Sequence, residues 1–117
     1  MNMNEFDVLT DYGLDALSAV VHTNAMEKGF WDGDFTYDKV GSKLALVHSE
    51  VTEVLEGVRK NKGSSAIVEE VADIIIRTLD VYAAMRDNGV VDDSLDELLQ
   101  KKIDINKERP KLHGNLF

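Results

Sequence analysis

Residues 44–83 read LALVHSEVTEVLEGVRKNKGSSAIVEEVADIIIRTLDVYA and contain two acidic pairs, Glu50-x-x-Glu53 and Glu70-x-x-Asp73. Residues three apart lie on one face of a helix, so each pair places its two carboxylates together. The turn-forming segment 61–65 predicts two antiparallel helices that bring the pairs face to face. Four carboxylates that converge in this way repel one another unless a cation lies between them. The stretch therefore predicts a helical hairpin whose metal ligands are Glu50, Glu53, Glu70 and Asp73.

The chemistry of these side chains indicates which metal ion to expect. Carboxylate oxygens suit hard cations, so we expect Mg²⁺, with Mn²⁺ able to substitute. A di-iron bundle needs Glu-x-x-His on two helices, and none of His22, His48 and His113 follows a Glu by three residues. The chain has no cysteine, which excludes zinc-thiolate and iron–sulfur sites. The alternative to a metal site is a solvated acidic face, but both pairs border the apolar stripe of their helix.

Hydrophobic periodicity predicts an all-α fold for a single domain that spans residues 1–117. We expect helices over residues 12–28, from 36 or 38 to 60, over 65–87, and from 92 or 94 to just before Pro110. Either Ser64 or Ser65 is the expected cap of the third helix. The tail 111–117 is expected to be irregular. These elements predict a four-helix, antiparallel bundle-type protomer.

The third expected helix is apolar around much of its circumference. A small single-layer bundle cannot bury so broad an arc, so we expect a homodimer or homotetramer in which this helix is central. A central helix buried within one monomer is the alternative. The residues of the arc are Ile67, Val68, Val71, Ile74, Ile75, Leu79, Tyr82 and Met85.

Charge and hydropathy exclude several classes of partner. The net charge of −9 argues against nucleic acids and anionic membranes as partners. No apolar stretch approaches the length of a membrane span, and residues 1–7 lack the basic and apolar regions of a signal peptide. We therefore expect a cytoplasmic protein with neither a membrane nor a nucleic-acid partner.

Two further groups of residues suggest a phosphorylated substrate. Lys102, Asn106 and Arg109 lie at i, i+4 and i+7, on one face of the fourth expected helix. This row of two basic side chains and an amide, the basic ladder, suits phosphate oxygens. The alternative is that its cations only complement the dipole at the end of the helix. Trp31 lies in a glycine-flanked loop, where it can either stack on a nucleobase or cover a hydrophobic core. His22, which is near Trp31 in the sequence, is either a structural histidine or a hydrogen-bonding partner of the substrate. A metal beside basic side chains favours a polyphosphate.

In these segments the chain resembles the MazG-like, all-α nucleoside triphosphate pyrophosphohydrolases. The acidic pairs match E-x-x-E followed by E-x-x-D, KGFWDG is similar to compact members, and KIDINKERPKLHGNLF resembles the ending K-x-x-x-N-x-x-R-P-x-x-H-G. The resemblance covers nearly the whole chain, from about Leu14 to Phe117, with the three matches in the family's order.

The resemblance implies Mg²⁺-dependent hydrolysis of ribo- or deoxyribonucleoside triphosphates between the α and β phosphates, giving a monophosphate and pyrophosphate in nucleotide-pool house-cleaning. It also implies dimers, or dimers of dimers. The implied metal ligands are Glu50, Glu53, Glu70 and Asp73. We expect the general base to be Glu50 or Glu53. The implied contacts to the triphosphate and the base are Lys102, Asn106, Arg109, Trp31 and His22.

Two other functions stay open. Broad apolar helices also suit a non-catalytic helical dimerisation module, and a phosphoribosyl-ATP pyrophosphohydrolase-like enzyme would use similar chemistry. These residues do not determine the preferred base and sugar, the number of metal ions, the choice between dimer and tetramer, or whether the role is housekeeping or regulatory.

Overall fold

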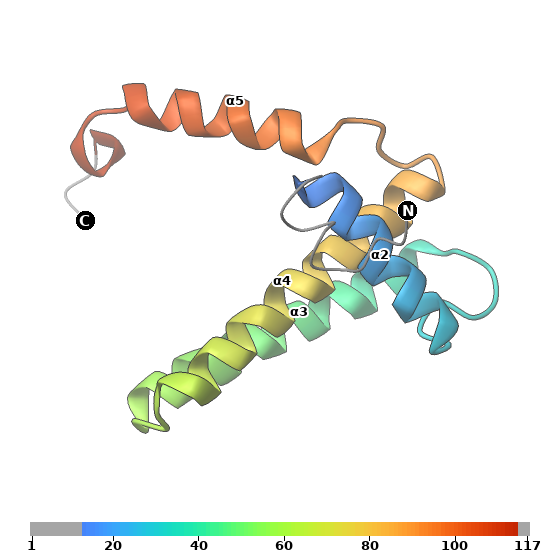
Figure 1. Cartoon of the computed structure of the whole chain (residues 1–117), viewed down its shortest axis with the longest axis horizontal. Helices are drawn as coiled ribbons and strands as arrows, with labels where there is room; N and C mark the ends of the chain where they lie inside the picture. The colour runs from blue at the N-terminus through green and yellow to red at the C-terminus, as the bar shows by residue number, and fades with distance from the viewer. Residues whose placement is uncertain (1–12, 115–117) are drawn as a thin grey trace, which may run out of the picture.

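The computed structural model describes residues 13–114, which form four α-helices and a short 3₁₀-helix (Figure 1). The elements are α2 (Gly13–Glu27), α3 (Tyr37–Arg59), α4 (Ser64–Asp87), α5 (Leu95–Glu108) and η1 (Lys111–Gly114). The all-α class is thus confirmed for this part of the chain, while the expected helix start at residue 12 lies outside it. Among the described helices, none combines the length and apolarity that a membrane span requires.

Side-chain caps define the starts of α3 and α5. The hydroxyl of Thr36 accepts a hydrogen bond from the amide of Lys39, and that of Ser94 accepts one from Glu97, each at 3.2 Å. Both residues have extended backbone angles, as N-cap residues do. At the other end of the chain, the expectation of an irregular tail is wrong for residues 111–114, which form the 3₁₀-helix η1.

The start of α4 differs from the expectation. Ser64 and Ser65 lie inside the helix, and the N-cap is Gly63, with φ of 95° and no side-chain hydrogen bond. The predicted serine cap is therefore wrong. The turn that reverses the chain between α3 and α4 requires a left-handed backbone at residue 63, which glycine adopts without steric cost. As a consequence, no capping side chain satisfies the first amides of α4.

Helices α3 and α4 form a long antiparallel hairpin, and α2 lies across its end away from the turn (Figure 1). The residues buried between α2 and α4 are small, since Ser18, Ala83 and Ala84 are all fully buried. The larger apolar residues Leu14, Leu17 and Val21 of α2 are only half-buried. Small side chains let the two backbones approach closely, and this moves the larger residues to the flanks.

Helix α5 runs away from the hairpin, and among the described helices it contacts only α2 (Figure 1). The radius of gyration is 16.6 Å, whereas a compact domain of this length is expected to have about 13 Å. The protomer is therefore open: three helices pack together and the fourth projects from them.

Reciprocal helix caps hold α5 in this position. The carboxylate of Asp96 accepts hydrogen bonds from the amides of Leu14 and Asp15, at 2.8 and 3.1 Å. The carboxylate of Asp15 in turn accepts from the amide of Leu95, at 2.9 Å, and from the hydroxyl of Ser94. Burial opposes ionisation of Asp15, but these hydrogen bonds outweigh it and lower its pKa. Each cap contributes about 1 kcal/mol, so the two helices start from one shared, fixed point.

A large apolar surface stays exposed on the distal part of the hairpin and on α5. Val68 is 63% exposed and Val58 58%, although both belong to strongly periodic apolar stripes. Monomeric proteins rarely leave extensive apolar surface in water. The other exposed residues of this kind on α3, α4 and α5 are Leu44, Leu46, Val51, Leu55, Val71, Ile75, Ile76, Leu98, Leu99, Ile103 and Ile105.

Candidate metal centre

Three of the four predicted ligands converge on the hairpin. Glu50 and Glu53 come from α3 and Glu70 from α4, and one carboxylate oxygen of each lies within 4.8 Å of the others. Gly57 is buried one turn further along α3, where an added Cβ atom would lie 3.5 Å from Ile67 of α4, an ordinary van der Waals contact. Gly57 therefore faces α4 beside the carboxylates.

The fourth predicted ligand, Asp73, does not belong to this group. Its exposed side chain lines a separate cavity of about 160 Å³ between α2 and α4, together with Phe30, Arg77 and Asp80. The i, i+3 step advances one turn along α4 and also rotates the side chain around the helix. That rotation directs Asp73 toward α2, whereas Glu70 faces α3.

Arg77 is a site residue whose pairing the sequence does not reveal. Its Nε atom donates a hydrogen bond to Oε1 of Glu50 at 2.9 Å, and the Glu50 side chain is only 14% exposed. The Glu70 carboxyl lowers the pKa of Glu50 by hydrogen bonding to it, and Arg77 lowers it further against the effect of burial. Glu50 is therefore held ionised. The seven-residue step from Glu70 to Arg77, two helical turns, is the signal that places both on one face of α4.

Glu70 is in the opposite electrostatic situation. Hydrogen bonds to Glu50 and Glu53, with burial and the charges of both, raise the pKa of Glu70 to about 7. Its Oε2 atom is buried and has no hydrogen-bond partner. Ionised carboxylates only accept hydrogen bonds, so the three groups need either a shared proton or a cation. An orphaned carboxylate oxygen between two others fits a hard divalent cation.

His22 and Trp31 meet at a third acidic residue, Asp80. Nδ1 of His22 lies 2.7 Å from Oδ1 of Asp80, and Nε1 of Trp31 donates to both carboxylate oxygens at 3.0 Å. The two rings pack edge to face, with centroids 5.7 Å apart. His22 and Asp80 are buried, so this contact fastens the aromatic loop to α2 and α4. A cavity of about 200 Å³, lined partly by His22, Trp31 and Phe35, adjoins it.

Asp80 was not a predicted site residue, but its position carries a signal. It follows Arg77 by three residues and Glu70 by ten, so the stripe of polar side chains on α4 continues to the aromatic loop. Helix α4 thus carries one member of each group, Glu70 of the carboxylate cluster and, further along, the Asp80 that holds His22 and Trp31.

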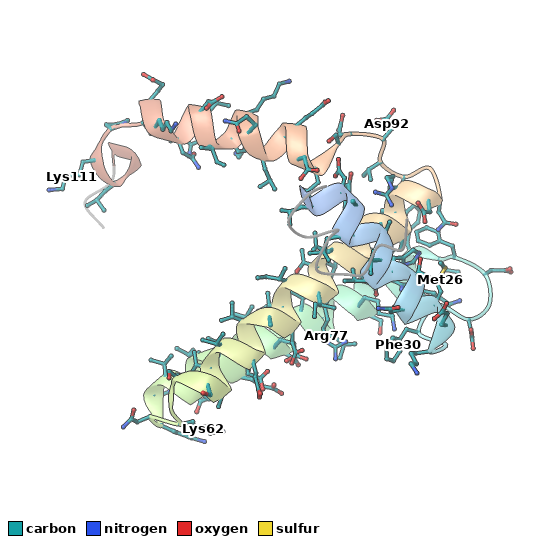
Figure 2. All side chains as sticks on the ribbon, viewed as in Figure 1. Met26, Phe30, Lys62, Arg77, Asp92 and Lys111 are labelled. Carbon is teal, nitrogen blue, oxygen red and sulfur yellow. The ribbon has the colours of Figure 1, made fainter. Side chains whose placement is uncertain are left out.

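Within one protomer, the helix that carries the basic ladder does not contact the helices that carry the carboxylates. Lys102 and Asn106 are exposed on α5 and Arg109 at its C-cap, and this helix runs apart from the hairpin that carries Lys62 and Arg77 (Figure 2). The reciprocal caps at the start of α5 produce this separation. The side chain of His113, also part of the C-terminal motif, lies outside the described residues.

Comparisons of the chain with protein-family models, with curated proteins and with solved structures found no match. Because folds of this class host many functions, a function has to be argued from the chemistry of the site.

Replacing Glu70 by Gln tests the electrostatic balance of the cluster. The pKa of Glu70 exceeds its ordinary value of 4.5, so the folded state binds more protons than the unfolded state up to about pH 7. The metal-free protein therefore loses stability as pH rises through 7, and Mg²⁺ should raise the melting temperature more at about pH 8 than at about pH 6. When both proteins are free of metal at about pH 8, E70Q should be more stable than the natural chain. Mg²⁺ should raise the melting temperature of E70Q only slightly.

Thermal denaturation with and without Mg²⁺ measures both effects. The matched control is Glu69→Gln, which removes the same charge from the preceding, exposed residue. An equal Mg²⁺ shift in E70Q and the natural chain would contradict a metal centre at these carboxylates.

Proposed function

We propose that this protein hydrolyses nucleoside triphosphates between the α and β phosphates in a Mg²⁺-dependent reaction, releasing a monophosphate and pyrophosphate. The observation that carries the proposal is the convergence of Glu50, Glu53 and Glu70 around a buried oxygen without a partner. The resemblance to MazG-like pyrophosphohydrolases, in the acidic pairs and the C-terminal ladder, supports the same reaction. We place it in house-cleaning of the cytoplasmic nucleotide pool.

Glu50, Glu53 and Glu70 would hold the cation, with Asp73 on the next turn of α4 as the proposed fourth ligand. When bound, Mg²⁺ would neutralise the triphosphate and polarise the phosphorus under attack. Arg77 keeps Glu50 ionised by donating to its Oε1 atom. Glu53 is exposed at the edge of the cluster and makes no such ion pair among the described residues, which favours it as the general base.

In the proposed step, a water oxygen forms a bond to phosphorus while the bridging oxygen between the α and β phosphates leaves with pyrophosphate. Glu53 accepts the proton that the water loses. At the other end of the polar stripe, the nucleobase would bind beside Trp31, whose ring lines a cavity and whose Nε1 atom is held by Asp80. An aromatic face and a hydrogen-bonding rim suit a nucleobase.

Lys102, Asn106 and Arg109 belong to the proposal only if a second copy supplies them. Helix α5 contacts neither helix of the hairpin in its own protomer, and both surfaces expose apolar residues such as Ile103 and Ile75. We propose a homodimer, or a pair of dimers, in which α5 of one protomer packs on the hairpin of its partner. The ladder would then face carboxylates of opposite charge, where it stabilises the leaving pyrophosphate.

Replacing Glu53 by Gln should lower the rate of triphosphate cleavage by roughly 10²- to 10⁴-fold, because it removes a ligand and the general base together. The measurement resolves the products of a panel of ribo- and deoxyribonucleoside triphosphates, with phosphoribosyl-ATP included. Monophosphate and pyrophosphate are the expected products, and Glu69→Gln should retain activity. Full activity of a folded E53Q would exclude the proposed base, and no cleavage by the natural chain would favour a dimerisation module.

Mixing two inactive variants tests whether the site is shared between copies. Glu53→Gln alters the carboxylates of the hairpin, and Lys102→Met alters α5. In a heterodimer of the two variants, one of the two sites therefore combines a natural hairpin with a natural α5. Equimolar mixing after subunit exchange should restore roughly a quarter of the natural activity. Failure to regain activity, in a mixture shown by native mass spectrometry to contain heterodimers, would place Lys102 outside the shared site.

A further inference from the structure

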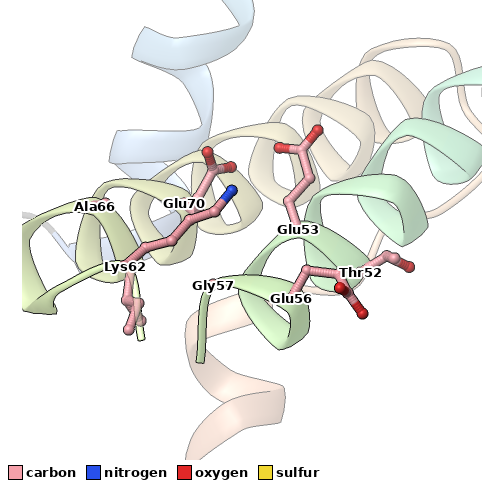
Figure 3. Close-up of a pocket in the computed structure, with 8 residues that line it drawn as sticks. Thr52, Glu53, Glu56, Gly57, Lys62, Ala66 and Glu70 are labelled. Atoms are coloured by element: carbon pink, nitrogen blue, oxygen red, sulfur yellow. The ribbon is translucent and has the colours of Figure 1, made fainter. Parts of the chain in front are cut away.

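A cavity of about 380 Å³ opens between α3 and α4 on the turn side of the carboxylates (Figure 3). Glu53 and Glu70 of the carboxylate cluster line it, together with Glu56, which pairs with Lys60, and the small residues Gly57 and Ala66. Lys62, from the turn between the helices, also lines it and extends its ammonium group toward Glu70 (Figure 3). One cavity therefore joins acidic metal ligands to a cation on the same protomer.

The ammonium group of Lys62 is not an internal counterion of the cluster. Two residues earlier, Nζ of Lys60 pairs with Glu56 at 3.6 Å. Lys62 makes no ion pair within 4.0 Å among the described residues, and Oε2 of Glu70 likewise has no partner. A lysine placed to neutralise Glu70 would satisfy that oxygen. Instead, the lysine and the carboxylates face a common space, which suits an anion held by a metal on one side and an ammonium group on the other.

The backbone adds to the positive side of this cavity. Helix α4 begins beside it, and its N-cap Gly63 offers no side chain to the first amides of the helix. These amides and the helix dipole favour negative charge near Ala66, which lines the cavity. The ligand chemistry that Lys62 implies is therefore a phosphate group.

The position of the cavity along α4 indicates how a nucleotide would be oriented in the site. Asp80, which holds Trp31, lies ten residues beyond Glu70 on α4, or about 15 Å along the helix. Lys62 lies beyond Glu70 in the opposite direction, at the turn. An extended nucleotide with its base beside Trp31 and its phosphates at the carboxylates would thus have its terminal phosphates at Lys62.

We propose that the cavity between α3 and α4 binds the terminal phosphates of the substrate, and the pyrophosphate product, through Lys62. The inference rests on the proposed function for the orientation of the nucleotide, and it adds a phosphate contact that each protomer makes by itself, without α5 of a second copy.

The test is calorimetric titration of the natural chain with pyrophosphate in the presence of Mg²⁺, compared with the four ribonucleoside monophosphates. Lys62→Met should weaken pyrophosphate binding about tenfold, as expected for loss of one charge-assisted contact. Lys62→Arg should retain most of the affinity. Lys28→Met removes the same charge from an exposed residue that does not line this cavity, and should leave pyrophosphate binding unchanged. Binding of monophosphates should not respond to any of these changes.

Three results would overturn the inference: no pyrophosphate binding by the natural chain, unchanged binding by K62M, or an equal loss for pyrophosphate and monophosphates. Tighter Mg²⁺ binding by K62M with undiminished pyrophosphate affinity would show that the lysine is only a counterion. Failure of the proposed function is a separate outcome, because pyrophosphate can bind at Lys62 even if triphosphates are not cleaved.

Discussion

The crowding of Glu50, Glu53 and Glu70 is the constraint on which the rest of the molecule depends. Their oxygens lie within 4.8 Å of one another because the packed helices α3 and α4 bring them face to face. Arg77 forms an ion pair with Glu50. The pKa of Glu70, in contrast, is raised to about 7, and the Oε2 atom of Glu70 has no hydrogen-bond partner. The hairpin is therefore built so that a proton or a divalent cation must complete it.

Everything else that bears on function is arranged relative to this cluster. On one side, the close contact of α2 with α4 brings His22 and Trp31 onto Asp80 and forms an aromatic cavity. On the other side, Lys62 faces a cavity shared with the carboxylates. Helix α5 instead leaves its own hairpin, and its apolar and basic side chains are exposed. The carboxylates and the basic residues of α5 are therefore separate within one protomer, which is why we propose that a second copy brings them together.

The local features of this site are predictable from sequence, because helical spacing and turn chemistry act over a few residues. The hairpin and the convergence of Glu50, Glu53 and Glu70 follow from that spacing. The displacement of Asp73 does not, since it depends on which neighbour each turn of α4 faces. Nor does the direction of α5, which is set by caps between Asp15 and Asp96, residues 81 positions apart in the chain. The prediction of a serine cap was wrong because the turn requires a positive φ at residue 63, which favours glycine over serine as the N-cap.

The most direct test of the central claim is titration with Mn²⁺, followed by electron paramagnetic resonance of the free ion at about pH 8, above the pKa of about 7 of Glu70. The natural chain should remove Mn²⁺ from solution, Mg²⁺ should displace it, and Glu70→Gln should bind much more weakly while Glu69→Gln binds normally. If the natural chain binds no Mn²⁺ at millimolar concentration, or if E70Q binds it equally well, the converging carboxylates are not a metal centre.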